Sequence, residues 1–351
     1  MGEWTYILVP ASAICIALLT VPLIIRFAHR YQAYDQPGNR KLHEFPMPTL
    51  GGISFSLALI CIMLFLLEHA IVIALFSGLL VILITGILDD MFHLNPGIKF
   101  LAEIIASLLF IYLSGYSLLT FGDLLGLGEW TTGRYHIAVT VFCMIGVINA
   151  MNFIDGMDGL AGGVSLVACL FLAGFSFLCG NDIFTLLLLA LGGGLTGFLY
   201  YNSYPAKIYM GDTGSLVLGY LLSAFCVALV NIPDCDTRIL PVSMAVVMGL
   251  PIVDAILVMT NRMIHLKNPF YPDNTHIHHR LMRIIGNHKK TVWSLYLLMA
   301  CCGVLALLVR SLVEWHQFAI GVVFATFLFA SIYLLDYRGN RTRVFNSGNS
   351  V

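Results

Sequence analysis

The amino-acid sequence predicts an all-α polytopic membrane protein. Of its 351 residues, 59% are apolar and only 11% are charged, whereas a soluble protein carries about a quarter charged residues. The apolar residues also gather into long runs, as membrane-spanning helices require. The formal net charge is −1, so no basic character points to a nucleic-acid partner. We therefore interpret residues 1–351 as a single integral membrane domain.

Eleven segments are apolar enough to span a bilayer, which takes about 20 residues, or fewer where a helix is packed inside the bundle. In chain order they are 4–25, 50–67, 70–88, 98–113, 135–151, 164–180, 183–201, 214–230, 239–260, 291–309 and 318–335. The first lacks a basic amino-terminal region and a small-residue cleavage site, which favours a retained span over a signal peptide. The pairs 50–67/70–88 and 164–180/183–201 are separated by few polar residues, so each predicts a helical hairpin.

The distribution of Lys and Arg predicts the orientation. Fifteen of the 18 basic residues fall on one set of alternate connections. These are 26–49, 89–99, 152–163, 202–213, 261–290 and the tail 336–351. The opposite connections carry only Arg134, Arg238 and Arg310. The positive-inside rule makes the first set cytoplasmic, with the amino terminus outside and the carboxyl terminus inside. The outer segment 114–134 has a Gly-rich alternation typical of a small periplasmic hairpin.

The nine cysteines show no spacing that pairs them. Seven lie inside apolar runs, where small packing residues are expected rather than disulfides or metal ligands. These are Cys15, Cys61, Cys143, Cys169, Cys226, Cys301 and Cys302.

Acidic residues gather near the predicted cytoplasmic ends of the spans, where charge is costly and usually functional. They are Asp89, Asp90, Asp155, Asp158, Asp212 and Asp254. The first two form the sequence LDD at the end of the third span, and adjacent carboxylates repel each other unless a cation is near. The alternative is a solvated helix end.

The stretch NFIDGMDGL at 152–160 places two acids three residues apart. If this stretch is helical, Asp155 and Asp158 share a face. The glycines beside them allow close approach of a ligand and interrupt the helix. Irregular backbone at membrane depth survives only where it is buried in protein or lines a wet cavity. The alternative is a plain Asp-Gly turn; the spacing does not match an EF-hand.

The stretch YNSYPAKIYMGDTGSL contains Asp212 at the start of the eighth span. Thr213 and Ser215 offer hydroxyl and backbone N–H groups at a helix amino terminus, which suits phosphate. Asn202 and Lys207 nearby also favour an anion. The alternative is an ordinary Asp N-cap.

The large loop 261–283 concentrates basic and histidine side chains. They are Arg262, Lys267, His276, His278, His279, Arg280 and Arg283. No Cys accompanies the histidines and their spacing is not that of a zinc helix, so we favour an anionic substrate. The alternative is attraction to anionic lipid. The loop 39–52 adds Arg40, Lys41 and His43, with simple positive-inside topology as the alternative.

Together, these clusters predict phosphoryl transfer at the cytoplasmic face. Carboxylates without thiolates suit Mg²⁺, or Mn²⁺ as a substitute. Basic loops beside such a metal suit a pyrophosphate, and a membrane-embedded rim suits a lipid tail. Neutralising and aligning phosphate groups supplies most of the catalysis in this chemistry.

Five motifs in order carry a family resemblance. They are LDD (88–90), NFIDGMDGL (152–160), NSYPAKIYMGDTGS (202–215), PIVD (251–254) and PDNTHIHHRL (272–281). The chain resembles the polyprenyl-phosphate N-acetylhexosamine-1-phosphate transferases of the glycosyltransferase 4 family, and within them the WecA/TagO-like branch. The match runs from about residue 37 to residue 283.

The resemblance implies a Mg²⁺-dependent enzyme of the bacterial inner membrane. The phosphate oxygen of undecaprenyl phosphate would attack the β-phosphorus of a UDP-N-acetylhexosamine, with UDP-GlcNAc expected, in a single in-line displacement that releases UMP. Its product would begin a surface polysaccharide such as O antigen, enterobacterial common antigen or teichoic acid. A homodimer embedded in membrane lipid is also implied.

The resemblance assigns roles to the acids. Asp212 would be the magnesium ligand. Asp89 and Asp90 would lie beside the lipid phosphate, either accepting a proton or helping to hold the metal. Asp155 would lie in the nucleotide pocket close to the metal, and Asp158 would contact uracil or ribose.

The remaining roles fall on amide and cationic side chains. Asn152 and Asn202 would be supporting amides, and Lys99 would hold phosphate. The pyrophosphate or sugar would meet the large loop through Arg262, His276, His278 and His279.

Two functions of other classes compete with this interpretation. A transporter could bind substrate at broken helices beside intramembrane acids, although it would place those acids near the bilayer midplane rather than at one rim. A lipid-binding scaffold would show no turnover.

Overall fold

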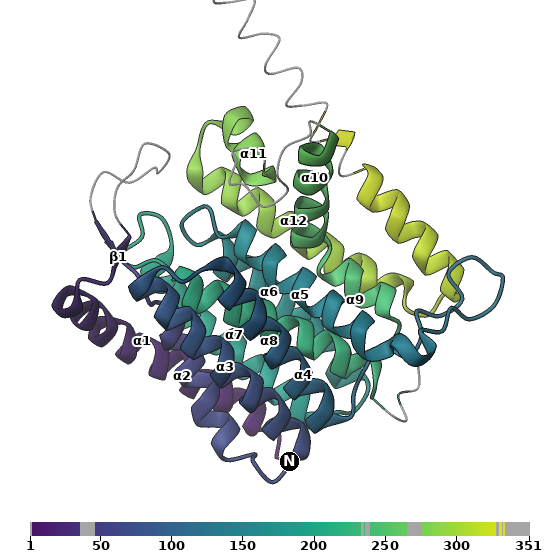
Figure 1. The fold of residues 1–351 in the computed structure, drawn as a ribbon, viewed down its shortest axis with the longest axis horizontal. Coiled ribbons are helices and arrows are strands. Elements are labelled where there is room, and N and C mark those ends of the chain that lie inside the picture. The colour runs from purple at the N-terminus through teal and green to yellow at the C-terminus, as the bar shows by residue number, and fades with distance from the viewer. Residues whose placement is uncertain are drawn as a thin grey trace, which may run out of the picture.

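The computed structural model describes residues 2–35, 46–232, 235, 239–264, 276–327, 330, 331 and 333. Over these ranges the chain forms a bundle of helices (Figure 1), which confirms the predicted all-α polytopic class. In order, the elements are α1 Thr5–Tyr31, β1 Tyr34–Asp35, β2 Met47–Pro48, α2 Gly52–Leu64, α3 Ala70–Phe92, α4 Pro96–Ser114, the 3-10 helix η1 Gly133–Tyr135, α5 His136–Ile154, α6 Leu160–Leu178, α7 Asp182–Asn202, α8 Gly211–Val230, α9 Pro241–Val247, α10 Gly249–Ile264, α11 Ile277–Ile285 and α12 His288–Val309. Residues 314–327 are helical too.

All eleven predicted segments are helical in the parts that the structure describes. Eight of the described helices are long and apolar enough to cross a membrane, or nine if the bent pair α9–α10 is one span. The helix in the second segment is too short to span a typical bilayer, because α2 has only 13 residues, about 20 Å of helix. The short strands β1 and β2 pair antiparallel, with Tyr34 opposite Pro48.

The predicted span 239–260 is broken, because it consists of two helices bent by 83° relative to each other. The break falls at Met248, which ends α9, and Pro251 follows in the first turn of α10. Proline has no N–H, and its ring clashes with the carbonyl four residues earlier, here that of Val247. A straight helix therefore cannot continue through this point.

Helix α8 lies at the centre of the bundle. It is the most deeply buried of the candidate spans in the described chain, and α2, α3 and α5 pack against it. Because α8 begins at Gly211, its first turn lies at the end of the bundle where α3 finishes. This places Asp212 beside the acidic pair of α3.

Glycine allows α3 and α2 to approach the first turn of α8. A Cβ on Gly86 of α3 would lie 2.5 Å from the Cα of Thr213, a separation that no side chain tolerates. Gly52 of α2 packs in the same way against the backbone of Gly214. The position of Asp212 relative to α3 therefore depends on the absence of side chains here.

We expect Gly86→Ala to push α3 away from α8 and to lower both stability and turnover. Overpacking of a well-packed interior costs about 1–3 kcal/mol, so the unfolding midpoint in detergent should fall measurably. Gly174→Ala is the matched control, because a Cβ at Gly174 in α6 meets nothing within 4 Å. Equal behaviour of the two variants would contradict the close approach.

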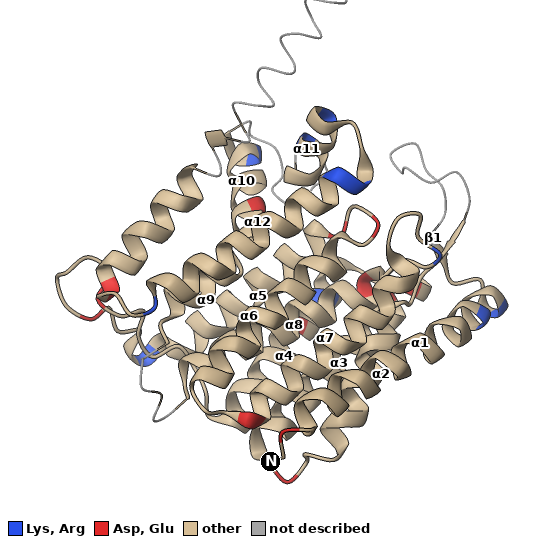
Figure 2. Cartoon of the chain, turned by 180° about the vertical axis from the view of Figure 1, so that it is seen from behind, with Lys and Arg blue, Asp and Glu red and all other residues tan. Residues whose placement is uncertain are grey.

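The two ends of the bundle differ in charge. Figure 2 shows Lys and Arg at the carboxyl end of α1, in α10 and in α11, away from the amino terminus. At the opposite end, the described basic residues are Arg134 and Arg310. Several counted residues lie outside the described ranges, namely Arg40, Lys41, Arg238, Lys267 and those of the tail 336–351, as does His43. The segment 114–134 contains the predicted small hairpin. Thr120 and Thr131 form an antiparallel bridge, and beside it the N–H of Phe121 donates to the carbonyl of Trp130 (3.0 Å) and the N–H of Thr132 donates to that of Leu119 (2.9 Å).

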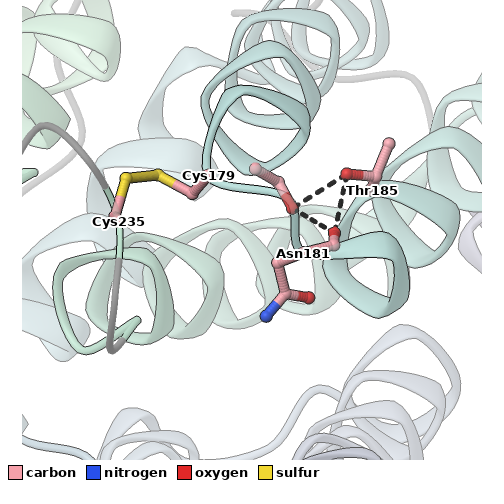
Figure 3. Close-up of a disulfide and its surroundings, with 5 residues drawn as sticks. Cys179, Asn181, Thr185 and Cys235 are labelled. Atoms are coloured by element: carbon pink, nitrogen blue, oxygen red, sulfur yellow. Dashed lines mark hydrogen bonds between the residues drawn. A yellow bond between two sulfur atoms is a disulfide. The ribbon is translucent and has the colours of Figure 1, made fainter.

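The cysteines divide as the hydropathy pattern predicted, with one addition. All seven cysteines of the apolar runs are free. The other two, Cys179 and Cys235, form a disulfide with a Cα–Cα distance of 4.7 Å (Figure 3). Cys179 ends α6 beside a turn in which Thr185 donates to the carbonyl of Asn181 (2.8 Å). The 19 residues of α6 span about 28 Å, so the disulfide lies a bilayer thickness away from Leu160.

Candidate active site

Lys99, in the first turn of α4, links the acidic pair of α3 to α8. Its Nζ donates to Oδ2 of Asp89 (2.9 Å) and to Oδ2 of Asp212 (2.7 Å). Asp89 is buried, and its other oxygen accepts the backbone N–H of Leu94 (2.8 Å). One ammonium group is thus shared by two carboxylates and relieves the repulsion between them.

Asp90 caps the amino terminus of α8. Its Oδ1 accepts the N–H of Asp212 (2.9 Å), and its Oδ2 accepts the N–H (3.1 Å) and hydroxyl (2.6 Å) of Thr213. A carboxylate here accepts hydrogen bonds from N–H groups that have no partner in the helix. Its negative charge is also stabilised by the positive end of the α8 dipole. The sequence predicted phosphate as the partner of these donors, whereas the fold brings Asp90 within reach of them.

Asn152, in the last turn of α5, holds the other side of Asp212. Its Nδ2 donates to Oδ1 of Asp212 (3.2 Å) and to the hydroxyl of Ser215 (2.8 Å). Both oxygens of Asp212 therefore have donors, Lys99 on one and Asn152 on the other. The carboxylate is held at a junction of α4, α5 and α8.

Asp155 follows α5 directly and has a carboxylate without a hydrogen-bonding partner among the described residues. Burial, together with the negative charges of Asp212, Asp90 and Asp158, raises its pKa to about 7. These acids are therefore close enough to interact. Both oxygens of Asp155 are free of donors from the described part of the chain and are available to a cation.

Two side chains tie the NFIDGMDGL turn to the segment before α8. Oδ2 of Asp158 accepts the N–H of Ala206 (3.0 Å). Asn202, which is buried, accepts the N–H of Gly159 (3.1 Å) and donates to the carbonyl of Ile208 (2.8 Å). Both residues hold the backbone in place, and their contacts with a nucleotide stay predictions.

Helix α11 brings His278 to the same turn. The His278 ring is buried, and neither ring nitrogen has a hydrogen-bonding partner in the described structure. Its Nε2 lies where a Cβ on Gly156 would clash with it, so the absence of a side chain there admits the ring. Burial, together with His279 and His276, lowers the pKa of His278 well below its usual value, which keeps the ring neutral. The ring of His279 lies 4.2 Å from it, centroid to centroid.

The structure thus brings most of the predicted site residues to one end of the bundle. A continuous cluster from α3, α4, α5 and α8 holds Asp89, Asp90, Lys99, Asn152 and Asp212. Asp155 interacts with this cluster electrostatically. Arg262 is buried in the last turn of α10.

The described residues fit a divalent cation only in part. Nowhere in them do three His, Cys, Asp or Glu side chains converge to hold a metal by themselves. Mg²⁺, however, usually keeps several waters and is bound by one or two carboxylates together with substrate phosphates. Asp155, whose oxygens are free of donors, and Asp212 fit such a site, which substrate phosphates would complete.

Three residues shape the site through partners that the sequence did not indicate. Gly156 admits His278, Ser215 accepts from Asn152, and Asp254 binds His276 through its side chain (2.9 Å). For Asp254, the sequence offered one signal: it is an acid in an otherwise apolar segment that precedes the histidine motif. It did not indicate which residues would become partners.

Comparison with known sequences points to one group of enzymes. Residues 72–230 match the sequence model of the family described as glycosyl transferase family 4, a range that includes the whole acidic cluster. The chain is 31% identical over 326 residues to a probable undecaprenyl-phosphate N-acetylglucosaminyl 1-phosphate transferase of Bacillus subtilis, covering 91% of this chain and 90% of that protein.

Other relatives carry related names. The undecaprenyl-phosphate alpha-N-acetylglucosaminyl 1-phosphate transferase of Escherichia coli K12 is 28% identical over 301 residues, covering 83% of this chain and 81% of that protein. The decaprenyl-phosphate N-acetylglucosaminephosphotransferase of Mycobacterium tuberculosis H37Rv is 28% identical over 326 residues, covering 82% and 80%. These names span two lengths of lipid acceptor and one sugar.

Proposed function

The chain belongs to the polyprenyl-phosphate N-acetylhexosamine-1-phosphate transferase family, and on this premise we propose that it transfers N-acetylglucosamine 1-phosphate from UDP-GlcNAc to undecaprenyl phosphate. The observation that carries the proposal is the similarity to such transferases over nine-tenths of the chain, together with the cluster around Asp212. The transporter alternative has no support among these relatives.

In the proposed reaction a phosphate oxygen of undecaprenyl phosphate attacks the β-phosphorus of the nucleotide sugar. A new P–O bond forms to that phosphorus, the P–O bond to UMP breaks, and UMP leaves with the electron pair. A lipid phosphate is largely ionised at neutral pH, so the reaction depends mainly on charge neutralisation and alignment. The Lys99 ammonium, already shared by two acids, would supply positive charge beside the phosphates.

Mg²⁺ fits this scheme, with Asp212 and Asp155 as its protein ligands. When bound, it would neutralise charge that builds up on the phosphate oxygens. The side chains around the metal site make contributions that are separate from that of Mg²⁺. Asn152 and Asp90 hold Asp212 and the first turn of α8 in position, and Lys99 keeps Asp89 and Asp212 from repelling each other.

We also propose that this site faces the cytoplasm of a bacterial inner membrane. The basic residues gather at the site end, as the positive-inside rule expects for the cytoplasmic side. The disulfide provides independent support, because disulfides persist in oxidising compartments. Cys179 lies at the opposite end of α6 from the site.

This orientation makes a testable prediction about thiol accessibility. In intact cells, Cys179 and Cys235 should resist a membrane-impermeant maleimide until an impermeant reductant is added, and should then react. A Lys289→Cys variant, at the site end next to the amino terminus of α12, should react only after the cells are permeabilised. Labelling of the Lys289→Cys variant in intact cells would reverse the proposed orientation.

An in vitro assay tests the proposed activity directly. The purified full-length protein is incubated with undecaprenyl phosphate, Mg²⁺ and UDP-GlcNAc labelled in the sugar. We expect release of UMP and transfer of label into a butanol-soluble product. UDP-GalNAc in a parallel reaction tests the sugar preference. If no UDP-N-acetylhexosamine yields UMP or labelled lipid, the transferase proposal is wrong and a lipid-binding scaffold becomes the better explanation.

A further inference from the structure

Asp254 is a buried acid that the proposed reaction leaves without a role. It lies in α10, beyond the bend at Pro251, and only 1% of its surface is exposed. A buried carboxylate is strongly unfavourable unless donors or a positive charge compensate for it. Its partners therefore indicate what it does.

The two partners of Asp254 are consecutive residues at the start of α11. Nδ1 of His276 donates to Oδ2 (2.9 Å), and the N–H of Ile277 donates to Oδ1 (2.7 Å). Ile277 is the first residue of α11, so its N–H has no acceptor within that helix. His276 occupies the N-cap position but forms no side-chain cap. Asp254 thus caps α11 from α10, with its negative charge at the positive end of the helix.

The contact with His276 also sets the orientation of the ring. An ionised carboxylate only accepts hydrogen bonds, so the proton of the shared bond belongs to Nδ1 of His276. The oriented ring stacks on His278, with centroids 5.6 Å apart and planes 11° from parallel. It also lies 5.8 Å from the ring of Phe153, centroid to centroid, and Phe153 is part of the NFIDGMDGL stretch.

His278 is the point at which this series of contacts reaches the site. Its ring is 2% exposed, both ring nitrogens lack partners among the described residues, and the ring lies against Gly156, next to Asp155. Buried polar atoms are nearly always hydrogen-bonded in proteins. Nε2 of His278, which lies beside Gly156, is such an atom at the acidic turn, and it indicates a polar group that arrives with the substrate.

We propose that Asp254 is a positioning residue, which holds His276 and the first turn of α11 so that His278 faces the turn of Asp155 and Gly156. The inference rests on the proposed function, because the group that His278 would meet is an oxygen of the nucleotide sugar. Asp254 itself does not touch the reacting atoms. It acts through the cap on Ile277 and through the stacked rings.

The Asp254→Asn variant of the full-length protein tests this role. Asparagine can still accept from Ile277 through Oδ1, but its NH₂ group then faces the donor Nδ1 of His276, so the ring must turn or change tautomer. Loss of a partner that orients a metal-ligating histidine costs about 10- to 100-fold in affinity or activity, and we expect a fall of similar size in kcat here. The KM for undecaprenyl phosphate and the unfolding midpoint should stay close to wild type. Asp182→Asn, an acid paired with Tyr6 at the opposite end of the bundle, is the control and should keep wild-type kcat.

A double-mutant cycle separates positioning from a general structural effect. If Asp254 acts through His278, adding Asp254→Asn to His278→Ala should change kcat by less than about twofold, because coupled sites are not additive. Losses that multiply independently would overturn the proposal. If Asp254→Asn does not fold, His276→Asn replaces it in the cycle, since it keeps a donor for Asp254 and removes the stacked ring.

A spectroscopic readout keeps this inference distinct from the proposed function. The ¹⁵N chemical shifts of His276 should show a proton on Nδ1 in the wild-type protein, whether or not turnover is detected. An unprotonated Nδ1, or an Asp254→Asn variant within twofold of the wild-type kcat, would overturn the positioning role. Absence of UMP release by the wild type would instead count against the transferase activity.

Discussion

Replacement of Asp212 by asparagine is expected to lower kcat by about a hundred- to a thousand-fold, the range seen when one preorganised electrostatic group is removed from an active site. Asparagine keeps the size of the side chain and an oxygen for Asn152, which donates to Asp212 over 3.2 Å. It removes the charge that binds the Lys99 ammonium over 2.7 Å and that would hold Mg²⁺. The loss should therefore appear in turnover and in the Mg²⁺ requirement.

The measurement compares UMP release by purified Asp212→Asn and Asp182→Asn. The control acid accepts a hydrogen bond from Tyr6 in the first turn of α7, at the end of the bundle away from the site. Both variants should reach the membrane in amounts similar to wild type. Near-wild-type turnover in Asp212→Asn would exclude Asp212 from the metal site and leave the central assignment without a basis.

Lys99→Met is expected to cause the second large effect, through two carboxylates instead of one. The ammonium of Lys99 lies 2.9 Å from Asp89 and 2.7 Å from Asp212, so its removal leaves two negative groups facing each other. These pairs are partly buried, with 25% of the Lys99 side chain and 30% of the Asp212 side chain exposed, so loss of the ammonium leaves two carboxylates that water compensates only in part. We expect a lower unfolding midpoint together with a loss of turnover of about a hundred-fold or more.

Added Mg²⁺ should separate the effect of Lys99→Met on stability from its effect on turnover. High Mg²⁺ should restore much of the unfolding midpoint of Lys99→Met, because a divalent cation can replace the ammonium between the acids. It should not restore kcat, since the positive charge that Lys99 would offer to the phosphates is still missing. Full recovery of turnover with Mg²⁺ would show that Lys99 serves only to compensate the acids. Lys99→Arg keeps the positive charge but not the compact ammonium. Its turnover should therefore lie between that of the wild type and that of Lys99→Met.

The sequence predicted the fold class, and it predicted that the acids gather at one end of the bundle, because both follow from local composition. Apolar runs of about 20 residues can be satisfied only as helices in a membrane, and all eleven segments are helical where described. Acids at the ends of such runs have few explanations other than function. The acids of α3, α5 and α8 accordingly lie at one end of the bundle.

The partners of these acids could not be predicted from the sequence. Asp90 and Thr213 are 123 residues apart in the chain, yet they share a 2.6 Å hydrogen bond. That contact exists because Gly86 lets α3 approach the backbone of α8. Because of the same close approach, the N–H and hydroxyl of Thr213, which the sequence suggested for phosphate, donate to Asp90 instead.

The disulfide and the bend at 239–260 were also predictable from the sequence only in part. Hydropathy separated the seven cysteines of the apolar runs from Cys179 and Cys235, but the disulfide depends on where α6 ends relative to the connection after α8. The bend at 239–260 had a local cause in Pro251. Its result, which is the capping of α11 by Asp254, depends on a helix that begins 23 residues later.

By itself, the sequence determined that the chain crosses a membrane as helices, that its charges gather at one rim, and that aspartates and histidines of a phosphoryl-transfer type lie on that rim. Hydropathy, charge and motif order are properties of neighbouring residues, so they can be read along the chain. The tertiary structure decided which carboxylates share Lys99, which one caps α8, which one has no donor among the described residues, and which cysteines join. Each of those outcomes depends on which atoms from distant parts of the chain come within bonding distance, about 3 Å for a hydrogen bond, and this is set only when the helices pack.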